Sequence, residues 1–364
     1  MRMKHSRLAI FGVMTAAVIG LGQICGGASV SDGGIFKSVD RGQTWEQKVF
    51  VSQQGRKTLT ISDLNTTILS QDPSNPANIF IGTEADGMFF SGNGGDQWGQ
   101  VTQINTGKVR GIVFDPLTPT TLYVLRDNQI LKSIDAGTTW ETIYTETSGK
   151  VMVFMDLNRQ SPNILFAGLE HGKIIRSTDG GVNWSVILAE PRQPILRVLL
   201  NPTSPNIMYA LEREKDLWRS SDNGVTWEKL YNHDHILQVA GAGRPLRLIM
   251  DTKNPSTIYL IAENIGLIRS DDNGDNWTLV NTLVGRDADT MTAFLVDPSD
   301  SNTLWLGVGH FIHVSYDRGA TWTVNEAFPS TRDIVFFSVD QQDSTLLYAG
   351  TRAVEEEGGL FGPK

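Results

Sequence analysis

The chain has 364 residues, of which 40% are hydrophobic and 36 are glycine. The hydrophobic share is ordinary for a globular protein, whereas the glycine content favours a fold with many tight turns. Acidic residues outnumber basic ones, with 40 Asp and Glu against 31 Lys and Arg and a formal net charge of −9. Because phosphate backbones and anionic lipids require a basic surface, this charge argues against nucleic acid as a partner and against direct adhesion to a membrane.

The first residues are typical of a targeting segment. Arg2, Lys4 and Arg7 precede an apolar stretch, residues 8–21, that contains no charge. This stretch is shorter than the roughly 20 residues that cross a bilayer as a helix, which favours an export signal. Counting on to Ile24 leaves an uncleaved anchor as the alternative. We therefore expect residues 1–28 to be a signal peptide or membrane anchor with a short linker, and the exported remainder to carry a formal charge near −12.

Cys25 is the only cysteine and follows this stretch directly. Its position, with Gly26-Gly27-Ala28-Ser29 after it, resembles that of the acylated cysteine of a bacterial lipoprotein. The preceding Gly22-Gln23-Ile24 departs from the usual lipoprotein signal, so cleavage after Ala28 is the alternative. Cys25 is thus a candidate lipidation site, which predicts an extracellular or periplasmic protein attached to a membrane only through its N-terminus. With one cysteine no internal disulfide can form.

One eight-residue pattern, which we call the box, recurs seven times. Its consensus is Ser, any residue, Asp, any residue, Gly, any residue, Thr, Trp, and the copies occupy residues 38–45, 91–98, 133–140, 177–184, 220–227, 270–277 and 315–322. The pattern predicts a β-hairpin whose Asp accepts backbone N–H bonds, whose Gly supplies a positive φ and whose Trp covers the returning strand. We therefore expect a structural role for the third residue of each box: Asp40, Asn93, Asp135, Asp179, Asp222, Asp272 and Asp317.

A second repeated unit lies between the boxes. It is a turn followed by a short apolar strand with a central aromatic, as in Asn78-Ile79-Phe80-Ile81-Gly82, and another apolar segment precedes it, as in Gly111-Ile112-Val113-Phe114-Asp115. Each period of 42 to 53 residues thus contains four strands. Seven such periods predict an all-β fold, a single seven-bladed β-propeller of four-stranded blades over residues 29–364.

The order of these pieces predicts how the ring closes. The chain begins with a box hairpin (33–49) that has no inner strands before it, and it ends with an inner pair (334–339 and 346–350) that has no box after it. Joined, they complete the seventh blade and remove an open sheet edge. Because Gly359-Leu360-Phe361 repeats the pattern of Gly34-Ile35-Phe36, a further or competing C-terminal strand is left open.

The box resembles the Asp-box, or bacterial neuraminidase repeat, of propellers that include sialidases, two-propeller xyloglucanases, sortilin-type receptors and the photosystem II assembly propellers. The resemblance covers about residues 33–351. The boxes depart from it at Asn93 for Asp and at Gln97, Asn183 and Asn276 for Thr. It implies the fold and leaves two function classes open, namely a glycoside hydrolase or carbohydrate-binding protein and a non-catalytic binding scaffold.

The enzyme hypothesis makes demands that the sequence meets poorly. A sialidase-like enzyme would need an arginine cluster, a Tyr nucleophile and an Arg-Ile-Pro motif, and this motif does not occur in the chain. The tyrosines and tryptophans fall on repeat positions, which leaves no spare aromatic platform for a sugar. Paired carboxylates stay open because 40 acidic residues are present, although the box aspartates are committed to turns. We assign no catalytic residue and no cofactor.

Two histidine pairs deserve comparison with metal sites. His233 and His235 alternate in a long connecting loop and would face the same way on an extended segment. His310 and His313 are three residues apart on an expected strand and would face opposite sides. A solvated loop explains the first pair more simply, so we expect no metal site.

The binding hypothesis places a partner on the face away from the boxes. Glu84, Glu170 and Glu263 each lie four residues after the aromatic residue of their strand, and Glu212 lies one residue from the equivalent place. Together with two further loop residues they are the predicted partner-binding residues: Glu84, Asp86, Glu170, Glu212, Glu263 and Arg352. A partial acidic ring favours a basic protein segment or a cation, whereas the simpler explanation is that surface loops are charged. The arginine-rich binding face of the photosystem assembly propellers has no counterpart in the sequence. We expect a monomer that binds a protein or surface ligand.

Overall fold

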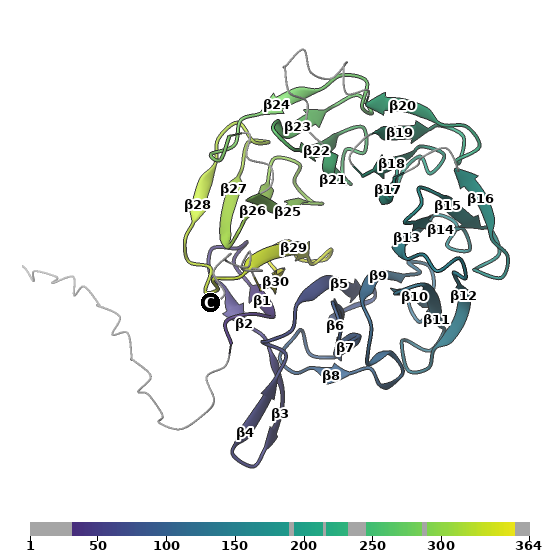
Figure 1. Cartoon of the computed structure of the whole chain (residues 1–364). Coiled ribbons are helices and arrows are strands. Elements are labelled where there is room, and N and C mark those ends of the chain that lie inside the picture. Colours follow the sequence, from purple (N-terminus) through teal and green to yellow (C-terminus); the bar gives the residue numbers. More distant parts are fainter. Residues whose placement is uncertain (1–30, 189–192, 214–215, 232–244, 286–289, 354–364) are drawn as a thin grey trace, which may run out of the picture.

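The computed structural model describes residues 31–188, 193–213, 216–231, 245–285 and 290–353. They form seven antiparallel four-stranded sheets arranged as the blades of a closed ring (Figure 1). The predicted seven-bladed β-propeller is therefore confirmed. Among the described residues no helix is long and apolar enough to cross a membrane.

Each blade runs from an inner strand beside the central channel to an outer strand at the rim, and we number the blades 1–7 from the sheet that starts with β5. The inner strands contact one another around the ring; they are β5 (Thr66–Asp72), β9 (Val109–Phe114), β13 (Met152–Leu157), β17 (Ile195–Leu200), β21 (Pro245–Met250), β25 (Met291–Val296) and β29 (Asp333–Val339). The second strands are β6 (Asn75–Thr83), β10 (Leu122–Arg126), β14 (Leu165–Leu169), β18 (Met208–Glu212), β22 (Ile258–Ala262), β26 (Leu304–Val308) and β30 (Leu347–Arg352).

The third and fourth strands flank the boxes. The third strands are β7 (Met88–Ser91), β11 (Gln129–Ser133), β15 (Ile174–Ser177), β19 (Leu217–Ser220), β23 (Gly266–Ser270), β27 (Phe311–Ser315) and, in blade 7, β1 (Ile35–Ser38). The outer strands are β8 (Gly99–Gln100), β12 (Glu141–Thr145), β16 (Ser185–Leu188), β20 (Glu228–Tyr231), β24 (Thr278–Val280), β28 (Thr323–Asn325) and β2 (Glu46–Gln47). A short 3-10 helix, η1 (Thr102–Ile104), lies between blades 1 and 2 along the chain.

Blade 7 closes the ring as the sequence predicts. Strand β1 pairs with β30 in register from Ile35 with Gly350 to Ser38 with Leu347. Beyond this ladder, Gly34 donates its N–H to Thr351 Oγ1 at 2.8 Å. The first and last described strands thus lie side by side in one sheet, whereas the repeated segment 359–361 lies outside the described residues.

The apolar core is divided among the contacts between blades. The described residues form seven hydrophobic clusters, and each of them joins two neighbouring blades. Between blades 4 and 5, for example, Tyr209 and Leu211 of β18 pack with Leu260 of β22. Each blade is therefore stabilised mainly by its two neighbours, as in other repeat proteins.

The boxes fold as the sequence predicts, through their own hydrogen bonds. In blade 4, Ser220 Oγ donates to Asp222 Oδ1 at 2.8 Å and accepts the Gly224 N–H at 2.8 Å. The Thr226 hydroxyl donates to Asp222 Oδ2 at 2.6 Å. These bonds favour the ionised carboxylate and lower the pKa of Asp222 to about 2. The hydroxyl of Thr226 has the largest effect, and the backbone N–H of Thr226 has the next largest. The carboxylate is therefore part of the turn.

Each box also connects two blades. Its fourth residue has a positive φ of 57° to 73°. In five blades the carbonyl of this residue accepts a hydrogen bond from a cation on the third strand of the preceding blade; the pairs are Lys37 with Gly94, Lys132 with Gly180, Arg176 with Asn223, Arg219 with Asn273 and Arg269 with Arg318, at 2.8 to 3.4 Å. We call these five cations the blade connectors.

The second box differs because a hairpin is inserted before it. Strands β3 (Phe50–Gln54) and β4 (Lys57–Thr60) form a two-stranded sheet that projects from the ring in Figure 1. Gln97 Nε2 donates to the Val51 carbonyl at 2.9 Å, and the indole of Trp98 donates to the Lys48 carbonyl at 2.9 Å. In the other boxes the indole bonds the glycine of its own box. The unusual Gln97 thus holds the insertion.

Candidate functional site

The face opposite the boxes carries one residue at an equivalent place in every blade. This place lies at the end of the second strand, four residues after its aromatic residue. We call it the ring position, and its seven residues are Glu84, Asp127, Glu170, Arg213, Glu263, Gly309 and Arg352. In five blades its N–H donates to the carbonyl of a residue near the start of the inner strand, at 2.7 to 3.0 Å. Four of the seven residues are acidic.

The predicted partner-binding residues therefore divide into groups. Glu84, Glu170, Glu263 and Arg352 occupy the ring position, and Glu170 and Arg352 are exposed. Glu84 forms an ion pair with Lys108. Asp86 is exposed two residues beyond the ring position, where its N–H donates to Thr83 Oγ1 at 2.9 Å.

Glu212 is separated from this group by the alternation of side chains along a strand. It is the last residue of β18, one position before the ring position, and successive strand residues face opposite sides. Its side chain is buried, Oε2 accepts the indole N–H of Trp218 at 3.2 Å and Oε1 accepts the Gln193 N–H at 3.1 Å. These contacts give Glu212 a packing role within blade 4.

Asp127 is the acidic residue of the ring position that we did not predict. It lies four residues after Tyr123, so the spacing that selects the glutamates also selects it. Asp127 Oδ1 accepts the Lys108 N–H at 3.0 Å and lies 3.9 Å from Arg110 Nη1. The spacing from the aromatic was the available signal, and restricting it to glutamate excluded this residue.

A cavity of about 590 Å³ occupies the central channel on the side of the boxes. Its walls come from inner strands, and its rim comes from the turns between the first and second strands, which contribute Pro73, Pro116, Pro202 and Pro298. Arg110, Arg159 and Arg197 line it, together with the carboxylates of Asp72, Asp156 and Asp340. The sequence shows no run of basic residues, yet the fold brings three arginines from separate segments to one space.

Arg197 has an unusual environment in this cavity. The residue is exposed, but the surface that it exposes faces the channel, which protein encloses. The enclosing protein removes part of the bulk water around the guanidinium, and this lowers the pKa of Arg197. The charge of Asp156 opposes that shift and the charge of Arg159 adds to it. Within the part of the chain that the structure describes, no hydrogen bond or ion pair joins Arg197 to another residue.

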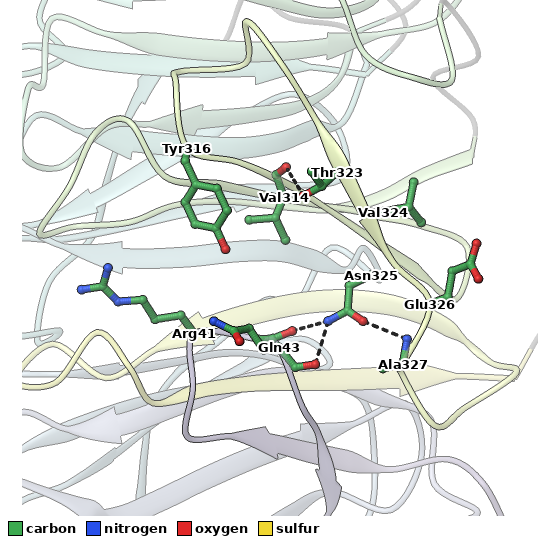
Figure 2. A pocket seen from close by; sticks show the side chains of 10 residues that line it. Arg41, Gln43, Val314, Tyr316, Thr323, Val324, Asn325, Glu326 and Ala327 are labelled. Carbon is green, nitrogen blue, oxygen red and sulfur yellow. Dashed lines mark hydrogen bonds between the residues drawn. The ribbon is translucent and has the colours of Figure 1, made fainter. Parts of the chain in front are cut away.

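A second pocket, of about 490 Å³, lies at the contact between blades 6 and 7 (Figure 2). Val314 occupies the position that a blade connector holds in five other blades. Asn325 instead donates to the Gln43 carbonyl at 3.1 Å, and Tyr316 and Arg41 flank the opening. The pocket is thus explained by a short side chain where the other contacts carry a long one.

The candidate metal-binding and lipidation residues lie in different parts of the chain. His313 is buried in the core and burial lowers its pKa, whereas the His310 ring lies against Phe311 at 4.1 Å between centroids. Among the described residues no group of three or more His, Cys, Asp or Glu is placed to hold a metal ion. His233, His235 and Cys25 lie outside the described residues.

Comparison with known proteins gives fold likeness at low identity. No family model matches the sequence, and the search of curated proteins gave no match. The structure resembles a GH74 enzyme from Niastella koreensis with a TM-score of 0.60 and 16% identity, over 84% of this chain and 53% of that one, so this chain spans about half of that enzyme. It also resembles YCF48 from Cyanidioschyzon merolae, with a TM-score of 0.61 and 13% identity over 79% of this chain and 96% of that one.

A third solved structure, YCF48 bound to D1 peptide, has a TM-score of 0.61 and 14% identity over 80% of this chain and 94% of that one. Identities this low establish the propeller architecture alone.

Proposed function

We propose that this chain is a non-catalytic exported propeller that binds a protein partner at the cell envelope. The observation that carries the proposal is the set of four carboxylates at the ring position: Glu84, Asp127, Glu170 and Glu263. They lie on a face formed by loops, which is where rigid scaffolds commonly carry their binding residues. Their summed charge favours a partner segment rich in Lys or Arg and speeds its association.

The neighbours of these carboxylates make some of them better candidates for the partner than others. Glu84 already pairs with Lys108, and Asp127 accepts a backbone N–H. Glu170 is exposed and Glu263 is half-buried. We therefore assign the main partner contact to Glu170, with Glu263 and Arg352 of the ring position and the neighbouring Asp86 as further contacts.

The fold comparisons supply an analogy for this function. YCF48, which shares the propeller, was solved with a bound peptide, and its length matches this chain far better than that of the GH74 enzyme. Hydrolysis of a glycoside would require one carboxyl group with a raised pKa. Every aspartate or glutamate of the described residues whose pKa is shifted has it lowered, because hydrogen bonds or cations favour the carboxylate, as at Asp135 and Asp179. This favours binding over hydrolysis.

The N-terminal expectations belong to the same proposal. We propose that residues 1–28 direct export, that Cys25 is acylated after cleavage and that the propeller belongs to the Asp-box group on the strength of its seven boxes. Mass spectrometry of the mature N-terminal peptide decides the first two points. A peptide that begins with an acylated Cys25 is expected, and one that begins at Ser29 would refute lipidation.

The partner contact is tested by affinity capture from envelope fractions with the full chain as bait. The variant Glu170→Gln/Glu263→Gln removes two charges from the ring position. The matched control, Glu141→Gln/Glu326→Gln, removes two exposed charges, one on β12 and one directly after β28. We expect the control to retain the partner and the ring variant to lose most of it. Equal capture by both variants would rule out the ring position as the contact, whereas a glycan or glycosidase signal without a protein partner would replace the proposal by the carbohydrate hypothesis.

A further inference from the structure

The seven turns that rim the central cavity share one design. In each blade an aspartate or asparagine stands at the end of the inner strand or directly after it, and its side-chain oxygen accepts the backbone N–H of a following residue. These residues are Asp72, Asp115, Asn158, Asn201, Asp251, Asp297 and Asp340. Five are aspartates. The two asparagines are in blades 3 and 4, which are neighbours.

Asparagine forms this turn as well as aspartate does. Asn158 Oδ1 accepts the N–H groups of Gln160 and Ser161 at 2.9 and 3.1 Å. Asp115 Oδ1 accepts two equivalent bonds at 2.8 and 3.0 Å. The turn therefore requires the oxygen and not the charge. The exchange of aspartate for asparagine removes negative charge from one sector of the rim without changing its backbone.

The same two blades supply two of the channel arginines. Arg159 directly follows Asn158, and Arg197 lies on β17, the strand that Asn201 follows. Asp156 Oδ1, in the cavity wall, lies 3.7 Å from Arg159 Nη2 and accepts the Leu157 N–H at 2.8 Å, and the charge of Asp156 also acts on Arg197. One carboxylate thus faces two guanidinium groups, and Arg197 has no ion pair of its own among the described residues.

The other charged side chains that line the cavity belong to blades 1, 2 and 7. Arg110 of blade 2 carries the third guanidinium, and its Nη1 lies 3.9 Å from Asp127 Oδ1 at the ring position, so this charge has a partner outside the cavity. Asp72 Oδ2 accepts the amide of Asn78 at 3.1 Å, and Asp340 Oδ2 accepts the amide of Gln71 at 3.4 Å. Both aspartates belong to blades 1 and 7, across the ring from the asparagine sector.

We propose that the channel binds a small organic polyanion, such as a di- or tricarboxylate or a phosphate ester, between blades 3 and 4. Guanidinium groups bind carboxylate and phosphate oxygens through paired, charge-assisted hydrogen bonds. The cavity of about 590 Å³ has the size of an ordinary ligand site. This site lies on the side of the propeller that carries the boxes, whereas the ring position lies on the opposite face.

The test is isothermal titration of the full chain with citrate, with inorganic phosphate and with an acidic peptide, in one detergent buffer at physiological salt. We expect saturable binding of citrate or phosphate at one site per chain. Arg197→Gln and Arg159→Gln should each weaken it at least about 10-fold, the effect of losing one hydrogen bond to a charged group. Arg56→Gln, at the exposed tip of the inserted hairpin, removes the same charge and should leave the affinity unchanged.

A second variant tests the asparagine sector while keeping the turns. Asn158→Asp/Asn201→Asp restores the residue found in the other five blades and should weaken the anion several-fold without lowering Tm. The ring variant Glu170→Gln/Glu263→Gln should bind the anion normally, which separates this site from the partner site. The proposal is overturned if neither citrate nor phosphate binds saturably, if Arg197→Gln binds like Arg56→Gln, or if only the acidic peptide binds.

Discussion

At the scale of single residues, similar positions in different blades show which side chains the fold requires. His313 illustrates this, because its equivalents on the other third strands are Phe36, Phe89, Leu131, Ile175, Trp218 and Ile268. All of these are apolar. His313 is 5% exposed, and its Nδ1 has no hydrogen-bond partner among the described residues. A polar atom left unpaired in a core reduces stability.

We therefore predict that His313→Leu raises the free energy of unfolding by about 1 to 3 kcal/mol, the penalty that an unpaired buried polar group carries. Burial lowers the pKa of His313 below its ordinary value of 6.5, so protonation favours the unfolded chain. The wild-type protein should lose stability as the pH falls below about 6.5. Urea unfolding of both proteins at several pH values measures this. A variant with the same acid dependence as the wild type would show that His313 does not cause it.

At the scale of secondary-structure elements, the boxes matter as connections as much as turns. The blade connector Arg219 donates to the Asn273 carbonyl of the next box at 3.0 Å and also pairs with Glu228 and Asp275. Its side chain is 16% exposed, whereas both acids are more than half exposed. The ion pairs are therefore screened by solvent and the carbonyl bond is the stronger contribution.

We predict that Arg219→Met lowers the free energy of unfolding by about 1 to 3 kcal/mol, mainly through the lost bond of a charged donor. Arg56→Met is the control, because Arg56 is exposed on the inserted hairpin. Guanidinium unfolding of the two variants gives the difference. Equal midpoints would mean that apolar packing alone holds the blades together.

At the scale of the whole molecule, the ring depends on the pairing of its first and last described strands. Phe36 of β1 is fully buried, and its ring lies 4.7 Å from that of Phe328, between centroids. The cluster around it joins blade 7 to blade 6. Loosening β1 therefore removes both a strand of blade 7 and part of the core of its neighbour.

We predict that Phe36→Ala lowers the free energy of unfolding by about 3 to 5 kcal/mol, as for other large core truncations. Unfolding should stay a single transition, because each blade depends on both neighbours. Val39→Ala, at a side chain that is 63% exposed, should change little. Two separate transitions in denaturant would instead show that blade 7 opens independently of the other six.

The sequence by itself determined the architecture of this protein. Seven boxes, seven aromatic strands and the incomplete units at the two ends predicted the number of blades, the four strands of each and the closure through blade 7. These features are local and repeat along the chain, so the period and the turn residues are visible in the amino-acid order. The structural role of Asp222 and its equivalents could be predicted for the same reason, since each box satisfies its own polar groups.

Only the tertiary structure decided what the site residues do. Glu212 differs from the other glutamates by one position, and the alternation along β18 turns it into the protein toward Trp218. Gln97 departs from the box pattern because its partner, Val51, lies 46 residues earlier in the inserted hairpin. Arg110, Arg159 and Arg197 share a cavity although they come from three blades. These contacts join distant segments, so they depend on the closed ring, and no local pattern in the sequence encodes them.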